Sequence, residues 1–183
     1  MTRPLFALTL THPWAAAIAH LGKRVENRMW EPPSAMLAAS GGLIAIHGGV
    51  HPGNLNGKSQ KVRDFKENLA WIGANWKALM EEGLRAGHVA PQVAQGFTHT
   101  VAGRTYMNPE AFITTGVVAV ARVADVVRGH PSLWAAQDQY QWVLEDVRAI
   151  EPIPCPGKQK LWPLPADIAQ LTLERCEAAG ASQ

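Results

Sequence analysis

Three charged side chains lie close together near the start of the chain, at Lys23, Glu26 and Arg28. Tryptophans lie on both sides of this group, at Trp14 and Trp30. In a strand, Glu26 and Arg28 point to the same face, because side chains alternate along the backbone. Buried alone, such charges are costly. Paired, they form a polar cluster with cationic donors and a carboxylate acceptor.

These residue types suit the binding of a nucleobase or a nucleotide. A glutamate accepts a hydrogen bond from the exocyclic amine of a base, and arginine donates two parallel hydrogen bonds to a phosphate or a base edge. An indole ring, such as that of Trp14 or Trp30, stacks on a base. The alternative interpretation is an ordinary ion pair on a solvated strand face. The residues alone leave both interpretations open.

A second group of basic residues lies on a predicted helix. Residues 59–83 have apolar side chains at three- and four-residue spacings, which is typical of an amphipathic helix. We expect Trp71 and Trp76 to pack in the core formed by this helix. Its polar face carries Lys58, Lys61, Arg63 and Lys66. These four side chains are candidates for phosphate contacts, and the alternative is a solvated helix face.

The sequence indicates neither a metal site nor a cofactor. His47 and His51 have the spacing of two ligands on one helical turn, but the intervening glycines and Pro52 argue against a helix there. Cys155 and Cys176 form no close pair, so a zinc site or a disulfide framework is not expected. This cysteine usage fits a reducing compartment, and we expect a cytoplasmic protein.

The chain that positions these residues has the composition of one globular domain. It contains 183 residues, 47% of them hydrophobic and 17% charged, with a formal net charge of +2. These values exclude global disorder. No uncharged apolar window is long enough to predict a membrane helix. The small net charge does not by itself predict a nucleic-acid partner.

Apolar segments bounded by glycine and proline predict a sheet with few helices between its strands. We predict strands at residues 5–10, 23–30, 43–47, 115–127 and 141–150. We predict helices at residues 14–21 and 166–179, and a helical or loop insertion at about 54–110. The proline-rich residues 151–165 are expected to be loop or edge structure. This order predicts one α+β domain, 1–183, built on a small mixed or antiparallel β-barrel.

Two stretches also carry a family pattern. The first reads THPWAAAIAHLGKRVENRMWEPP and then GGLIAIHGG, and the second reads WVLEDVRAIEPIPCPGKQKLW. The Pro-Trp pair, the K-x-x-E-x-R spacing and the closing Trp, Pro and Gly positions resemble the ASCH domain family (activating signal cointegrator homology), of the PUA-like superfamily. The resemblance covers about residues 5–50 and 114–165. It departs at Leu21, where the family has glycine, and Gly22 follows one place later.

The resemblance implies a PUA-like β-barrel with a cleft next to the first helix. The charged motif would line that cleft, where single-stranded RNA or an extruded or modified base would bind. Lys23 and Arg28 would neutralise phosphate or donate to the base, and Glu26 would orient it. The implied partner is a nucleic acid or a nucleotide, and no membrane is expected.

Two alternative functions stay open. Some ASCH-like proteins are similar to amidohydrolases that deacylate N4-acetylcytidine, and others look like ribonucleases. In such an enzyme Lys23 and Glu26 would be catalytic. However, the amidohydrolase group has threonine at the position of Glu26, and a glutamate beside Lys23 favours the charged amine, which is a poor nucleophile. The other alternative is a protein-interaction module of coactivator type, with residues 152–165 as its docking surface.

Overall fold

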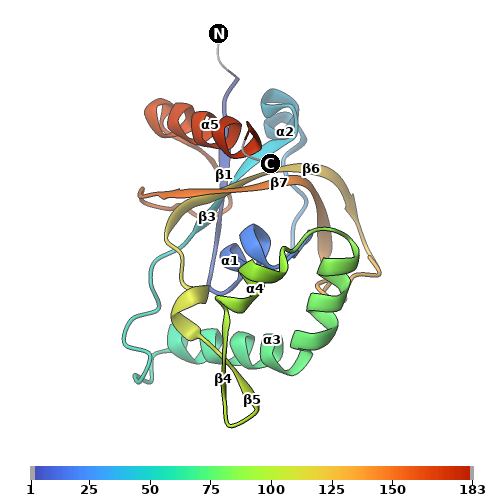
Figure 1. The fold of residues 1–183 in the computed structure, drawn as a ribbon. Coiled ribbons are helices and arrows are strands. Elements are labelled where there is room, and N and C mark those ends of the chain that lie inside the picture. Colours follow the sequence, from blue (N-terminus) through green and yellow to red (C-terminus); the bar gives the residue numbers. More distant parts are fainter. Residues whose placement is uncertain (1–2, 182–183) are drawn as a thin grey trace.

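A computed structural model describes residues 3–181 and has a mixed α+β fold, as predicted (Figure 1). Its centre is a curled, six-stranded half-barrel sheet with the order β2-β7-β6-β3-β1-β8. Strands β1 and β3 are parallel, and the other neighbours are antiparallel. The strands are β1 (Phe6–Leu10), β2 (Val25–Arg28), β3 (Leu43–Gly48), β6 (Gly116–Val127), β7 (Tyr140–Ile153) and β8 (Leu161–Pro163).

Alternation along β1 explains how the sheet separates two cores. Phe6, Leu8 and Leu10 face the core shared with α1 (Trp14–His20). Leu5 and Ala7 face the opposite core, which α5 (Ala166–Ala181) covers. Helix α5 therefore lies across one face of the sheet, while α1 lies against the other face, between the sheet and α3 (Gln60–Arg85) (Figure 1).

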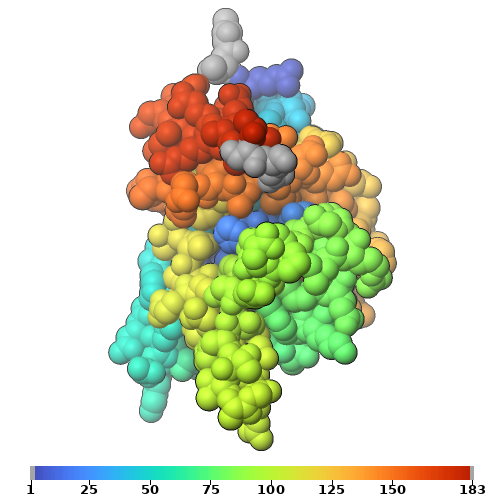
Figure 2. Space-filling model, viewed as in Figure 1, coloured from blue at the N-terminus to red at the C-terminus, as the bar shows by residue number. Residues whose placement is uncertain are grey.

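The insertion between β3 and β6 forms a third apolar cluster together with α1. Helix α3 begins after Ser59, whose hydroxyl accepts a hydrogen bond from the backbone N–H of Val62. Its apolar stripe, including Phe65 and Ile72, packs in one cluster with Ala16 of α1. Only a small part of α1 is visible between the sheet and the insertion in the space-filling view (Figure 2).

The rest of the insertion is more ordered than the weakly patterned sequence indicates. Instead of an irregular loop, it contains α4 (Pro91–Gln95) and a hairpin of β4 (Thr98–Val101) and β5 (Arg104–Met107). The hairpin projects away from the body (Figures 1 and 2) and is largely exposed on both faces. Because neither face is buried, the strands lack the apolar alternation that predicts a strand.

Of two further segments, one was not predicted and the other was predicted as edge structure. A short helix, α2 (Ser34–Ser40), lies where no helix was predicted. In the proline-rich segment, β7 continues to Ile153, and β8 pairs with β1 at the sheet edge, which confirms the edge-structure prediction. Among residues 3–181, no helix combines the length and the apolar character that a membrane span requires.

Candidate functional site

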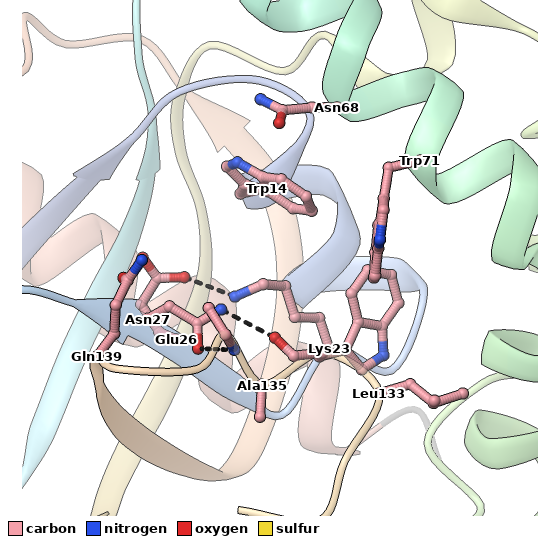
Figure 3. A pocket seen from close by; sticks show the side chains of 11 residues that line it. Trp14, Lys23, Glu26, Asn27, Asn68, Trp71, Leu133, Ala135 and Gln139 are labelled. Atoms are coloured by element: carbon pink, nitrogen blue, oxygen red, sulfur yellow. Dashed lines mark hydrogen bonds and ion pairs between the residues drawn. The ribbon is translucent and has the colours of Figure 1, made fainter. Parts of the chain in front are cut away.

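A cavity of about 400 Å³ lies where β2, α1, α3 and the loop before β7 meet (Figure 3). We call it the tryptophan cavity, because Trp14, Trp71 and Trp134 form its aromatic lining. Its polar lining consists of Lys23, Glu26, Asn27, Asn68 and Gln139. The insertion thus supplies one wall of the cavity through α3.

The three indole rings form an arc with Trp71 in the middle. The ring centroids of Trp14 and Trp71 are 6.3 Å apart at 63°, and those of Trp71 and Trp134 are 6.0 Å apart at 55°. Trp71 is 40% exposed, whereas Trp134 is 3% exposed. The buried Nε1 of Trp134 has no hydrogen-bond partner in the described part of the chain. The arc therefore presents apolar ring surface to the cavity, while the Nε1 donor of Trp134 is buried behind it.

A buried ion pair occupies the polar side of the cavity. Lys23 is 2% exposed and Glu26 is 5% exposed, and their Nζ and Oε2 atoms are 2.6 Å apart. The other carboxylate oxygen lies 3.1 Å from Nε of Arg28. Glu26 and Arg28 thus share a strand face, as predicted, and the Lys23–Glu26 pair is not part of a solvated surface.

Burial lowers the pKa of the Lys23 ammonium, and the Glu26 carboxylate opposes this shift. The Nζ atom also donates a hydrogen bond to the carbonyl of Val25 and lies 5.8 Å from the ring centre of Trp14. The lysine is therefore held in place by a carboxylate and a carbonyl. Figure 3 shows its contact with Glu26 and the indole ring of Trp14 above it.

The loop that carries Trp134 is anchored by side chains from two other elements. Asn27 of β2 donates to the carbonyl of Trp134 at 2.8 Å and accepts from the N–H of Ala136 at 2.9 Å. Glu82 of α3 accepts hydrogen bonds from the hydroxyl of Ser132 and the N–H of Leu133. These bonds position Trp134 against the cavity.

Two amides on the cavity wall are available to a ligand. The side chains of Asn68 and Gln139 make no hydrogen bond to residues 3–181. Each amide offers two donor hydrogens and one acceptor oxygen. They lie on different elements, Asn68 on α3 and Gln139 just before β7 (Figure 3).

The structure brings together only part of the predicted site. Trp30 lies outside the cavity and packs edge-on against Trp142, with ring centroids 5.0 Å apart. Arg28 and Lys61 line a second, neighbouring cavity. The remaining basic side chains of the predicted patch are exposed and line neither cavity: Lys58, just before α3, and Arg63 and Lys66 on α3.

Most of the aromatic wall was not predictable from local sequence patterns. Trp71 was expected in the core with Trp76, but it lines the cavity, while Trp76 packs against the core as predicted. Trp134 lies in an irregular segment after a glycine and a proline, where no periodicity indicates its direction. The only sequence signal was the surplus of tryptophan, seven in the chain.

Histidines held neutral predict that the protein loses stability in acid. Burial lowers the pKa of His12, His20 and His47. The unfolded chain then binds more protons than the folded one below the unfolded pKa of about 6.5, so stability falls as the pH falls through this value. Each histidine contributes a slope of up to about 1.4 kcal/mol per pH unit.

Urea unfolding between about pH 7 and pH 5 measures this effect. The His47→Gln variant is expected to show a smaller slope, because glutamine keeps a donor for the carbonyl of Cys155, now 3.0 Å from Nε2, without titrating. A free energy of unfolding that stays constant or rises as the pH is lowered would contradict the prediction.

A comparison of the chain with protein-family models found no match, and a comparison with curated proteins found none either.

Proposed function

We propose that this protein binds nucleic acid by holding one unpaired base in the tryptophan cavity. The base would belong to single-stranded RNA or would be an extruded or modified base. The observation that carries the proposal is the convergence of three indole rings and a buried carboxylate, Glu26, on one cavity of about 400 Å³. Pockets of this size hold small planar ligands.

The lining matches the two kinds of surface that a base presents. A base has π faces, which stack on aromatic side chains regardless of its sequence identity. Its edge carries amines, and the Glu26 carboxylate would accept hydrogen bonds from them. Asn68 and Gln139 would complete the contacts to the edge.

We also propose that the chain is an ASCH domain with a PUA-like fold. The half-barrel sheet, with the K-x-x-E-x-R residues beside α1, supports this assignment. In the proposed family arrangement, Lys23 and Glu26 belong to the ligand cleft. Lys23 would hold the Glu26 carboxylate in place so that its remaining lone pairs face the base.

Removing the exposed indole of the arc tests base binding. The Trp71→Ala variant is expected to weaken binding to short single-stranded RNA by about 5- to 150-fold, because stacking contributes about 1–3 kcal/mol per base. Fluorescence anisotropy with labelled RNA and DNA oligonucleotides measures the affinity. Because Trp71 is partly exposed, its loss is expected to leave the fold intact, which far-UV circular dichroism checks.

Tyr106 provides a matched control, since it is an aromatic residue that is 46% exposed and lines neither cavity. The Tyr106→Ala variant is expected to bind like the wild type. Absence of any binding by the wild-type protein at low salt, with unmodified and base-modified oligonucleotides, would refute the proposal. Equal losses in the Trp71 and Tyr106 variants would also argue against the cavity.

The second candidate is a hydrolase that acts on a modified base. It is favoured by one observation, the position of a fully buried lysine with a lowered pKa next to a carboxylate in the cavity. Such a pair can transfer a proton in hydrolysis of an amide. Release of acetate from N4-acetylcytidine by the wild type, and its loss in Lys23→Met, would support this candidate. Binding of the nucleoside without turnover would argue against it and support only the binding function. Shortening of an RNA oligonucleotide tests the ribonuclease alternative.

A further inference from the structure

A second cavity, of about 590 Å³, lies beside the tryptophan cavity and is rich in positive charge. Four cationic side chains line it, namely Arg28, Lys61, Lys158 and Lys160, against one carboxylate, Asp64. We call it the basic cavity. The whole chain has a formal net charge of only +2, so positive charge is concentrated here. A pocket lined in this way attracts an anion.

The two cavities are neighbours, because the same elements line both. In β2, Glu26 lines the tryptophan cavity, and Arg28 lines the basic cavity. Nε of Arg28 and Oε1 of Glu26 are only 3.1 Å apart, so this ion pair joins a residue that lines one cavity to a residue that lines the other.

The flanking segments follow the same division. On α3, Trp71 and Asn68 line the tryptophan cavity, and Lys61 lines the basic cavity nearer the start of the helix. Before α1, residues 9–12 line the basic cavity, and Trp14 lines the other. A ligand with a flat group and an anionic group joined by a short linker would reach both.

The backbone at Lys160 is strained. Its φ is +61°, in the left-handed region that glycine adopts at little cost and other residues adopt only with strain. A lysine in this conformation places a cation on the cavity wall at the expense of local stability. Strain of this kind is concentrated at binding sites.

The loop that carries both lysines is held against the sheet. Nε2 of His47 donates to the carbonyl of Cys155 at 3.0 Å, because a carbonyl oxygen can only accept. Gly157 lies so close to His47 and Thr9 that an added Cβ would be 2.6 Å and 2.9 Å from their nearest atoms. Lys158 and Lys160 therefore extend from a segment with a defined position.

We propose that the basic cavity binds the phosphate of a nucleotide whose base occupies the tryptophan cavity. This inference rests on the proposed function and narrows its ligand to a phosphorylated nucleotide. Arg28 would offer its guanidinium fork to two phosphate oxygens, and Lys158 and Lys160 would act as point charges. The phosphate would come from a nucleic-acid backbone or from a free nucleotide.

Calorimetric titration with a nucleoside and with its 5′-monophosphate, in parallel with a short oligonucleotide, tests the proposal. We expect the monophosphate or the oligonucleotide to bind at least tenfold more tightly than the nucleoside. The Lys158→Ala/Lys160→Gly double variant is expected to remove this advantage and to leave nucleoside affinity unchanged. If only the oligonucleotide binds more tightly than the nucleoside, the ligand is a backbone phosphate. If the monophosphate also binds more tightly than the nucleoside, the site accepts a free nucleotide.

The Lys160→Gly variant alone gives two readouts of opposite sign. It is expected to raise the thermal midpoint, because glycine relieves the positive φ, while it weakens phosphate binding. Affinity for the oligonucleotide is expected to depend less on salt. The negative slope of log affinity against log salt becomes shallower by about 0.7 for each lost phosphate contact. Lys66→Ala is the matched control, since Lys66 is exposed on α3 and lines neither cavity.

The outcomes separate this inference from the proposed function. If Trp71→Ala weakens oligonucleotide binding but the lysine variants do not, the phosphate site is refuted and base binding stands. If the nucleoside and both phosphorylated ligands bind equally well, the phosphate site is also refuted. If none of the three binds, the proposed function fails as well.

Discussion

The Glu26→Leu variant is expected to lower the free energy of unfolding by about 3–5 kcal/mol, because it leaves a buried charge without a partner. Nζ of Lys23 would lose the carboxylate oxygen that now lies 2.6 Å away. Lys23 is only 2% exposed, so water from the cavity would replace that oxygen only in part. Urea unfolding at neutral pH, followed by tryptophan fluorescence, measures the loss.

The double variant Lys23→Met/Glu26→Leu is the control for this interpretation. Replacing both members of a buried pair by apolar residues is often neutral or stabilising, so the double variant is expected to recover most of the lost stability. It would also remove the carboxylate proposed to accept from a base, so it should fold and yet bind RNA weakly. A double variant as unstable as the sum of the two single variants would show that the pair is not the source of the effect.

The Gly48→Ala variant is expected to lose more than about 4 kcal/mol, which for a chain of this size means little folded protein. A Cβ on Gly48 would lie 1.6 Å from the carbonyl oxygen of Thr114. Gly48 ends β3, where the chain enters the insertion, and Thr114 lies just before β6, where the chain returns to the sheet. Neither backbone segment can move away without breaking the pairing of β3 with β6.

Gly73 offers a matched glycine within the same insertion. It lies inside α3, and its added Cβ would meet only a flexible atom, Cγ of Met107, at 3.4 Å. The Gly73→Ala variant is therefore expected to be neutral or to gain up to about 1 kcal/mol of stability, because alanine favours helix. Yield of soluble protein and the thermal midpoint compare the two variants. A Gly48→Ala protein as stable as the wild type would contradict the close approach.

Local patterns were sufficient to predict the sheet and the charged strand. The apolar runs of β1, β3 and β6 and the spacing of α3 depend only on the alternation or periodicity of the chain. The hairpin of β4 and β5 escaped prediction because both its faces are exposed. Helix α2 escaped it because it spans only seven residues and buries little apolar surface.

The sequence by itself determined that Glu26 and Arg28 share one face of a strand, since strand geometry requires it. Only the tertiary structure decided which tryptophans join them. Trp71 reaches the cavity because α3 packs on α1, and Trp134 does so because Asn27 and Glu82 hold its loop. Trp30, adjacent to the motif in sequence, packs elsewhere. Contacts between distant segments depend on how whole elements pack, and no local spacing encodes them.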